Sequence, residues 1–177
     1  MRKVEVVPYQ QRWAKDYESE KDQIETVLED ECLAIHHIGS TAIPTISAKP
    51  IIDIMVEVKD IKKVDDFNVE FENLGYEALG ENGITDRRFF KKGGDDRTHH
   101  VHIFEQESLG IKRHIAFRDY MLAHPEEAKR YSELKQKLAR NFPSNIDRYI
   151  EGKDGYIKEI ERKAMEWLRE NKGDEQE

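Results

Sequence analysis

The chain has 177 residues, of which 37% are hydrophobic and 37% are charged, and its formal net charge at pH 7 is −8. This length suffices for a globular core, and the negative charge argues against nucleic acid as a partner. The single cysteine, Cys32, excludes an intrachain disulfide, and no apolar run approaches the roughly 18 residues of a membrane helix, so we expect a cytoplasmic protein without membrane contact.

The N-terminal part of the chain is predicted to alternate strands with helices. Residues 3–7 and 32–39 are short runs of apolar and β-branched side chains, as in strands. Residues 10–31 form a predicted helix, because their large apolar side chains fall on one helix face. Residues 51–58 read IIDIMVEV and are the strongest strand candidate, since nearly every position is apolar.

A helix, a short strand and a hairpin are expected next. Residues 60–74 are predicted to be helical up to the break at Gly75, and residues 76–79 form a short strand. Residues 87–92 and 99–105 flank a GGDD turn and are predicted to pair as an antiparallel hairpin.

The chain beyond residue 106 is predicted to be helical throughout. Two helices separated by Pro125 are followed by a further helical stretch that reaches residue 170. The expected fold class is therefore α+β. A mixed β-sheet flanked by helices would occupy residues 1–106, and a helical C-terminal extension, residues 107–177, would pack on it as part of one structural unit.

Asp53 lies inside the most apolar predicted strand. Side chains alternate between the two faces of a strand, so the apolar positions 52, 54, 56 and 58 face the core while Asp53, Met55 and Glu57 face the other way. A buried carboxylate is costly unless it is hydrogen-bonded, paired or bound to a metal. Asp53 is therefore either a structural acceptor for backbone N–H groups of the preceding loop or the acid of a functional cleft.

A Gly-Ser-Thr turn precedes that strand. Gly39 permits close backbone approach, and Ser40 and Thr41 supply hydroxyl and N–H groups, so the turn can hold a phosphate. Lys49 follows in the same loop and is placed to balance the phosphate charge. The alternatives are an ordinary Gly-Ser turn and a solvated loop lysine.

The predicted hairpin carries histidines and most of the local positive charge. His100 and His102 share one strand face, a spacing that lets two imidazoles bind one metal or lets one act as a general base. Arg87 and Arg97 belong to a basic cluster, which in so acidic a chain points to an anionic small ligand. The alternatives are two half-exposed strand histidines and an ordinary charged hairpin tip.

Two tyrosine–lysine pairs lie in the predicted C-terminal helices. Tyr131 with Lys135, and Tyr149 with Lys153, are each four positions apart, so each pair shares one helix face. Such pairs most often pack on a helix surface, and we predict surface packing for both.

Three stretches of the chain together resemble the GrpB family: HIGSTAIPTISAKPIIDIMV, RTHHVHIF and FRDYMLAHP. The resemblance extends over residues 4–168. The family is similar to the nucleotidyltransferase superfold of DNA polymerase β-like enzymes, in which a Gly-Ser turn binds the nucleoside triphosphate and acids on the next strand bind two divalent ions. The resemblance implies that Gly39 and Ser40 form this turn and that Asp53 is the first acid.

The second acid of a polymerase-type centre is missing. Acids two residues apart on a strand lie about 6.6 Å apart on one face, but the position two after Asp53 is Met55. Mg²⁺ requires hard oxygen ligands, and Glu57 lies about 13 Å from Asp53 along the strand. If the hairpin brings His100 and His102 to Asp53, the mixed nitrogen and oxygen ligands favour Zn²⁺ or Mn²⁺ over Mg²⁺.

The first functional hypothesis is metal-assisted transfer on a nucleotide or another phosphorylated small molecule. Asp53 and His102 would bind metal or activate an acceptor hydroxyl. The Gly-Ser-Thr turn would hold phosphate, and Lys49, Arg87 and Arg97 would balance its charge.

Two other functional classes remain open. The second hypothesis is a catalytically silent nucleotide-fold binding or regulatory module, which the missing second acid favours. The third is an interaction protein that uses its charged helical end. The Asp, His and Arg residues near one predicted cleft favour the first two hypotheses over the third.

Overall fold

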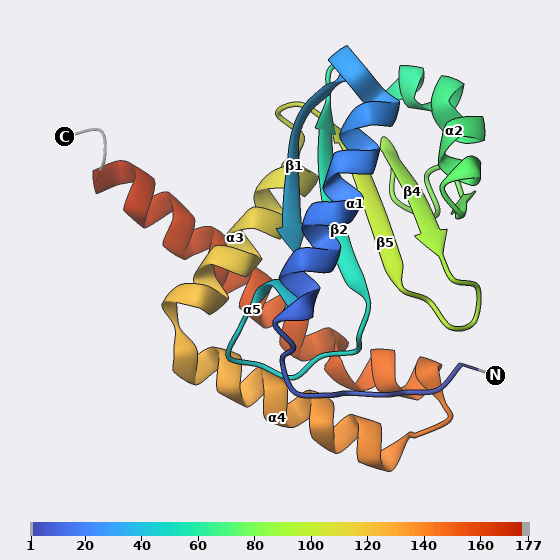
Figure 1. The fold of residues 1–177 in the computed structure, drawn as a ribbon. Helices are drawn as coiled ribbons and strands as arrows, with labels where there is room; N and C mark the ends of the chain where they lie inside the picture. The colour runs from blue at the N-terminus through green and yellow to red at the C-terminus, as the bar shows by residue number, and fades with distance from the viewer. Residues whose placement is uncertain (1, 175–177) are drawn as a thin grey trace.

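A five-stranded mixed β-sheet lies at the centre of the computed structural model, which describes the backbone of residues 2–174 and the side chains of residues 2–171. The strand order is β1-β2-β5-β4-β3 (Figure 1). In chain order the strands are β1 (Cys32–Ile38), β2 (Ile52–Val58), β3 (Tyr76–Ala78), β4 (Arg87–Lys92) and β5 (His99–Glu105). The helices are α1 (Arg12–Leu28), α2 (Asn68–Asn73), α3 (Leu109–Ala123), α4 (Pro125–Asn141) and α5 (Ile146–Asp174).

The pairing of β2 with β5 joins the acidic strand to the histidine-bearing strand. These two strands run parallel, whereas the β1–β2, β4–β5 and β3–β4 pairs are antiparallel. In the parallel register Asp53 lies opposite His100, and Met55 lies opposite His102. The predicted hairpin is confirmed as β4 and β5, and it places its histidines beside the predicted acid.

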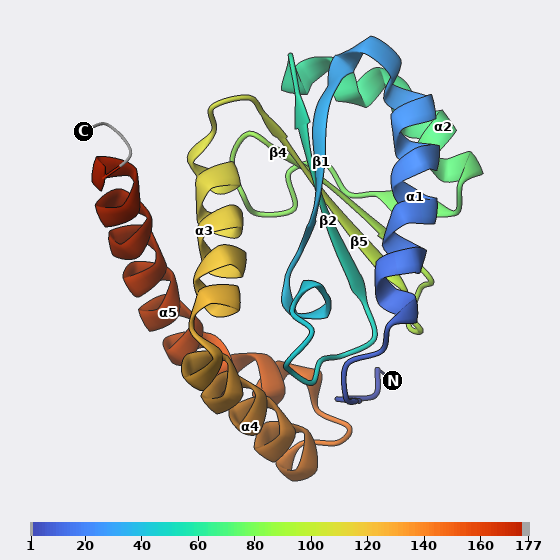
Figure 2. The same cartoon turned by 60° about the vertical axis from the view of Figure 1, so that its left-hand side comes forward.

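Helices cover both faces of the sheet (Figure 2). On one face α1 and α2 cover the apolar side chains at positions 52, 54, 56 and 58 of β2. On the other face Met55 and Phe104 pack against Ile111 of α3. The predicted alternation along β2 is therefore confirmed, and Asp53 faces away from the main core.

Helices α4 and α5 lie beneath the loop that joins β1 to β2 (Figures 1 and 2). The loop side chains Ile43 and Ile46 are buried together with Tyr131 of α4. The backbone N–H of Ser47 donates to Ser132 Oγ on α4 at 2.9 Å. The loop that carries the Gly-Ser-Thr turn is thus fixed against the helical region, and the predicted α+β class with flanking helices and a helical C-terminal region is confirmed.

The predicted strand at residues 3–7 is wrong. Within the described chain, this segment makes only an isolated β-bridge at Val7. Val4 is instead buried against Leu138 and Tyr149 of the helical region. Val4 and Val6 therefore pack on α4 and α5, whereas Val7 packs against the main core. A strand-like composition does not distinguish this packing from pairing in a sheet.

The predicted helix at residues 60–74 is only partly α-helical. The segment Ile61–Phe67 forms 3₁₀ turns, and α2 begins at Asn68. Ile61 and Val64 are both buried, and a 3₁₀ turn with three residues per turn places positions i and i+3 on the same side. The burial of these two side chains favours the tighter turn.

The helical region is divided into separate helices at the position predicted from the sequence. Pro125 begins α4 directly after the end of α3, and α5 is one continuous helix. Within residues 2–174, no helix is long and apolar enough to cross a membrane. Residues 175–177 of the predicted extension lie outside the described residues.

Candidate functional site

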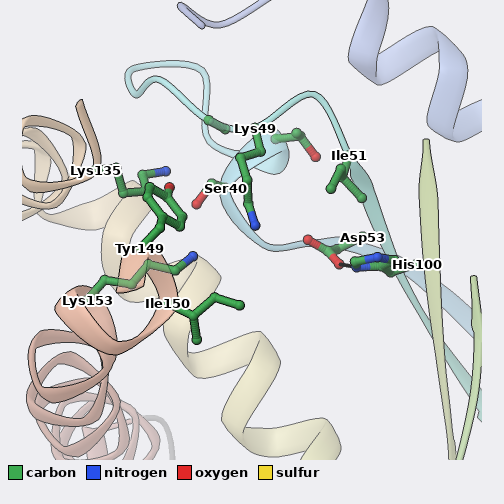
Figure 3. A pocket seen from close by; sticks show the side chains of 11 residues that line it. Ser40, Lys49, Ile51, Asp53, His100, Lys135, Tyr149, Ile150 and Lys153 are labelled. Atoms are coloured by element: carbon green, nitrogen blue, oxygen red, sulfur yellow. Dashed lines mark ion pairs between the residues drawn. The ribbon is translucent and has the colours of Figure 1, made fainter. Parts of the chain in front are cut away.

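The Gly-Ser-Thr turn, the start of β2 and the helices α4 and α5 enclose a cavity of about 260 Å³, which we call the lysine cavity. Its charged and polar lining side chains are Ser40, Thr41, Lys49, Asp53, His100, Lys135, Tyr149 and Lys153. In Figure 3 the strand residues Asp53 and His100 face Tyr149 and Lys153 across the cavity. The site is therefore built jointly by the sheet and the helical region.

The backbone of the turn lies so close to the Asp53 side chain that the turn residue facing it has to be a glycine. Gly39 has φ +71° and ψ −170°, a backbone conformation that is almost restricted to glycine. A Cβ atom at this position would lie 2.7 Å from Asp53 Oδ2. Ser40 lines a cavity together with Tyr131 of α4, and Thr41 Oγ1 lies 2.9 Å from His37 Nε2. The turn is thus fixed to β1 through Thr41.

Two imidazoles converge on Asp53. His102 Nε2 lies 3.3 Å from Asp53 Oδ1, and His100 Nδ1 lies 3.5 Å from the same oxygen. An ionised carboxylate can only accept, so each facing ring nitrogen carries the proton. Arg87 Nη1 then donates to the other ring nitrogen of His102 at 3.4 Å, which fixes the tautomer. Arg87 is anchored in turn by the backbone carbonyls of Glu81 and Asn82.

The environment of Asp53 keeps its carboxyl group ionised. Removal from water would raise the pKa of this group, but hydrogen bonds from His100 and His102 outweigh that effect and hold the pKa well below its usual range. The side chain retains 29% of its exposure. Asp53 therefore presents a full negative charge to the lysine cavity at neutral pH.

The donor set around Asp53 does not fit a metal centre. Both imidazoles contact one carboxylate oxygen directly, as hydrogen-bond donors. Among the described residues, no group of three or more His, Cys, Asp or Glu side chains is arranged to hold a metal ion. The predicted ligand set Asp53, His100 and His102 therefore comes together, but as a hydrogen-bonded cluster. The divalent ion stays a prediction from the sequence.

The place of a second catalytic acid is filled by apolar packing. Met55 is fully buried with Ile38, Phe104 and Ile111. Glu57, further along the same face, lies 2.6 Å from His36 Nε2 and is occupied there. Neither residue can supply a carboxylate beside Asp53.

Three lysines from three separate segments converge on the cavity. Lys135 of α4 is only 2% exposed, and removal from water together with repulsion from Lys153 and Lys49 lowers its pKa to about 6. Removal from water, together with repulsion from Lys153, Arg2 and Arg97, lowers the pKa of Lys49 to about 8. Removal from water also lowers the pKa of Lys153, against the attraction of Asp53. The unliganded cavity thus holds more positive charge than it can stabilise.

Tyrosine rings partly compensate this charge. The ammonium nitrogens of Lys49 and Lys153 lie 5.1 Å and 4.9 Å from the centre of the Tyr149 ring, and that of Lys135 lies 4.5 Å from the centre of the Tyr131 ring. The faces of aromatic rings attract cations, but they do not offer an ammonium group a conventional hydrogen-bond acceptor such as an oxygen atom. The rings therefore orient the lysine side chains without supplying a negative counter-charge.

Three buried polar atoms of the lysine cavity have no hydrogen-bond partner among the described residues. They are Lys135 Nζ, Tyr149 Oη and His100 Nε2. Buried polar groups are nearly always hydrogen-bonded in folded proteins, and an unmade bond is costly. Their convergence on one cavity indicates that a polar ligand completes these bonds.

The predicted site residues fall into three groups. Ser40, Thr41, Lys49, Asp53 and His100 line the lysine cavity, with Gly39 directly behind Asp53. His102 and Arg87 support Asp53 but do not belong to the cavity lining, so Arg87 is placed to position His102 rather than to balance ligand charge. Arg97 lines an adjoining cavity.

The prediction of surface packing for the two tyrosine–lysine pairs is wrong. Tyr131, Lys135 and Tyr149 are buried, and Lys135, Tyr149 and Lys153 line the lysine cavity. The signal was present, since each lysine shares a helix face with an aromatic ring. Spacing alone does not reveal which helix face is covered by the rest of the chain.

A second cavity, of about 200 Å³, adjoins the first. Ser40, Asp53 and Lys153 line both cavities. The second also has His114 and Glu161 in its lining. Removal from water lowers the pKa of His114 to about 4, so this imidazole is neutral at pH 7. Asp53 therefore stands between a strongly basic cavity and one of mixed polarity.

A sequence profile of the GrpB protein family matches residues 3–163. The chain belongs to the GrpB family. The UPF0157 protein YqkA of Bacillus subtilis (strain 168) is 49% identical over 166 residues, which cover 94% of this chain and 48% of that protein, so the chain spans about half of that relative.

A solved structure of the same family matches over most of the chain. The crystal structure of the conserved protein GrpB from Enterococcus faecalis matches with a TM-score of 0.90 at 44% identity, over 93% of this chain and 99% of that chain. A structure of the Cid1 poly(U) polymerase bound to MgATP matches with a TM-score of 0.46 at 15% identity, over 74% of this chain and 45% of that chain. The family predicted from the three sequence stretches is confirmed.

Proposed function

We propose that this GrpB-family protein binds a nucleotide or another phosphorylated small molecule, with phosphate oxygens in the lysine cavity. The observation that carries the proposal is the set of unpartnered polar atoms there, above all Lys135 Nζ. Phosphate oxygens are strong acceptors for ammonium and hydroxyl donors. One ligand group would thus complete the hydrogen bonds of Lys135 and Tyr149 and relieve the repulsion among three lysines.

The charge of the cavity supports an anion over a neutral ligand. Its lining contains three lysines and one carboxylate, Asp53. Burial is the main cause of the lowered pKa values of Lys135 and Lys49, and repulsion from neighbouring cations lowers both values further. Ser40 and its neighbouring turn complete the wall opposite Lys153 and add hydroxyl and N–H donors.

Titration calorimetry with sodium tripolyphosphate and with each nucleoside triphosphate tests this proposal. We expect binding by the wild type and, for Lys135→Met, an affinity lower by at least about tenfold, because one charge-assisted hydrogen bond is lost. Lys137→Met is the matched control, since Lys137 is exposed on the same helix, and its affinity should equal that of the wild type. Absence of binding by every phosphate compound, or equal affinity in Lys135→Met, would contradict the proposal.

The affinity for tripolyphosphate should fall as the pH rises. An anion favours protonated lysines, and Lys135 has a pKa of about 6 in the free protein, so binding above that pH takes up one proton. Between pH 7 and pH 8 the dissociation constant should rise about tenfold per unit. Above pH 8 it should rise more steeply, because Lys49, with a pKa of about 8, loses its proton as well. In Lys135→Met the rise of the dissociation constant between pH 7 and pH 8 should shrink to about twofold, the part due to Lys49, and the rise above pH 8 should be about tenfold per unit.

Transfer of a nucleotidyl group is the second candidate function, and the position of Asp53 favours it. Asp53 and Ser40 line both cavities, so an acceptor in the second cavity would face the phosphate in the first. The acceptor oxygen would attack the α-phosphorus, pyrophosphate would leave, and Asp53 would receive the hydroxyl proton.

Replacing Asp53 by asparagine distinguishes transfer from silent binding. Pyrophosphate release is measured with each nucleoside triphosphate, with Mg²⁺, Mn²⁺ or Zn²⁺, and with a panel of small hydroxyl compounds. If the protein is a transferase, Asp53→Asn abolishes release but retains tripolyphosphate binding, because it removes a negative charge from the wall of an anion site. A wild type that binds nucleotides and releases no pyrophosphate under any of these conditions is a binding module.

A further inference from the structure

A third cavity, of about 290 Å³, adjoins the lysine cavity on the side of the chain's N-terminus. Residues 2, 3 and 5, the start of α1 and the turn between β4 and β5 form its wall, and we call it the arginine cavity. Lys49 and Ile51 line both the lysine cavity and the arginine cavity. The side chain of Lys49 thus connects the two.

The arginine cavity carries an excess of positive charge. Its cationic lining residues are Arg2, Lys3, Arg12, Lys49 and Arg97, and its acidic ones are Glu5, Asp95 and Asp96. Arg12 is occupied by an ion pair with Asp16, 3.6 Å away. Glu5, Asp95 and Asp96 offset part of the charge, and Asp95 attracts Arg2. More cations than acids remain.

Two guanidinium groups in this cavity lack full compensation. Arg97 Nε is buried and has no hydrogen-bond partner among the described residues. Removal from water and repulsion from Arg97 lower the pKa of the Arg2 guanidinium, so the two groups lie near enough to oppose each other. Guanidinium groups that face a common space are the usual arrangement for recognising phosphate or carboxylate oxygens.

We propose that the arginine cavity is a second anion subsite and that the ligand of this protein carries two phosphate groups, or one phosphate chain long enough to reach both cavities. This inference rests on the proposed function, because it assigns one anionic group to the lysine cavity. Lys49 lies between the two groups and contacts both. Arg97 and Arg2 bind the group in the arginine cavity.

Two classes of ligand share this chemistry. A linear polyphosphate could extend from Ser40 past Lys49 to Arg97. An organic bisphosphate, such as a nucleoside 3′,5′-bisphosphate, could place one phosphate in each cavity with its body between them. The comparison of matched probes separates the two, because each long probe has a short counterpart that can occupy only one subsite.

The test measures dissociation constants by calorimetry at pH 7 and fixed ionic strength. The first pair of probes is tripolyphosphate and a longer linear polyphosphate, and the second is a nucleoside 5′-monophosphate and the 3′,5′-bisphosphate of the same nucleoside. The protein is used as the wild type, as Arg97→Gln and as Arg2→Gln. Arg88→Gln is the matched control, because Arg88 is paired with Asp65, 2.7 Å away, outside both cavities.

In the wild type we expect at least one longer probe to bind at least about tenfold more tightly than its short counterpart, as one additional charged contact implies. Arg97→Gln and Arg2→Gln should each remove most of this advantage and change the short probe's affinity less than about twofold. Arg88→Gln should change neither. Whichever pair shows the advantage identifies the ligand as a phosphate chain or a bisphosphate.

The inference fails if short probes bind and neither longer probe binds better, or if Arg97→Gln and Arg2→Gln weaken short and long probes equally. In both cases the lysine cavity remains an anion site. If no probe binds the wild type at all, the proposed function fails together with the inference, which is a different and recognisable result. Should Arg97→Gln not fold, Arg2→Gln alone decides.

Discussion

Replacement of Lys135 by methionine is expected to stabilise the unliganded protein at pH 7, although it removes a residue of the candidate site. Lys135 is buried, and its amino group has no hydrogen-bond partner among the described residues. An unsatisfied buried polar group costs about 1–3 kcal/mol. For a protein of this size that free energy corresponds to a rise in melting temperature of roughly 2–12 °C. Methionine has a similar length and no such group.

The pH dependence of this effect has a definite sign. The pKa of Lys135 is about 6 in the folded protein, far below the ordinary lysine value that it regains on unfolding. Between these two pKa values the unfolded state binds more protons, so the free energy of unfolding of the wild type rises with pH. The stability advantage of Lys135→Met should therefore be greatest near pH 6 and shrink steadily towards pH 10.

Thermal unfolding of wild type, Lys135→Met and Lys137→Met between pH 6 and pH 9 measures this. Lys137 is exposed on the same helix, so its replacement should leave the melting temperature within about 1 °C of the wild type. A lower melting temperature for Lys135→Met would show that its amino group is satisfied in the unliganded protein. That result would also remove the main support for the proposed anion site.

The strand-level features of the site could be predicted from the sequence because they depend on local rules. Alternation along β2 placed Asp53 away from the main core, and the histidine spacing placed His100 and His102 on one face of β5. The GGDD turn indicated the β4–β5 hairpin. In each case the signal is a period of two or a turn preference, and both are properties of short segments.

The helical contribution could not be predicted, because it depends on how distant segments pack. Lys135 and Lys153 lie on helices with the same spacing pattern as surface helices. Both face a cavity that is closed on its other side by the β1–β2 loop and the start of β2. Likewise, residues 3–7 have the composition of a strand, but Val4 and Val6 pack on the helical region. Local patterns contain no information about such partners.

In place of a second acid, the histidine pair contacts Asp53 and keeps its carboxyl group ionised. In a metal centre of the polymerase type, neighbouring acids would share the metal ions. Here Met55 joins an apolar cluster under α3, and His100 and His102 hold the single carboxylate ionised. The negative charge is thereby retained beside three lysines without a second carboxylate. This arrangement suits the binding of one phosphate group opposite a fixed acceptor.

Replacement of Gly39 by alanine is expected to lower the melting temperature by roughly 6–12 °C, equivalent to a loss of about 3 kcal/mol. Two causes add. The backbone at Gly39 has φ +71° and ψ −170°, which strains any residue with a Cβ atom. The new methyl group would also lie 2.7 Å from Asp53 Oδ2 and must displace the carboxylate. Tripolyphosphate binding should weaken as well, because Asp53 and Ser40 move.

Two further variants separate backbone strain from the collision with Asp53. Gly80 also has a positive φ, +60°, but a Cβ atom there would meet nothing within 4 Å, so Gly80→Ala should cost only about 1 kcal/mol. In a double-mutant cycle, Gly39→Ala should be at least about 1 kcal/mol less destabilising in an Asp53→Ala background, since the carboxylate is gone. If the losses of stability caused by Gly39→Ala and Asp53→Ala are simply additive, the new methyl group does not collide with Asp53. The close approach of Gly39 would then have no part in positioning the acid.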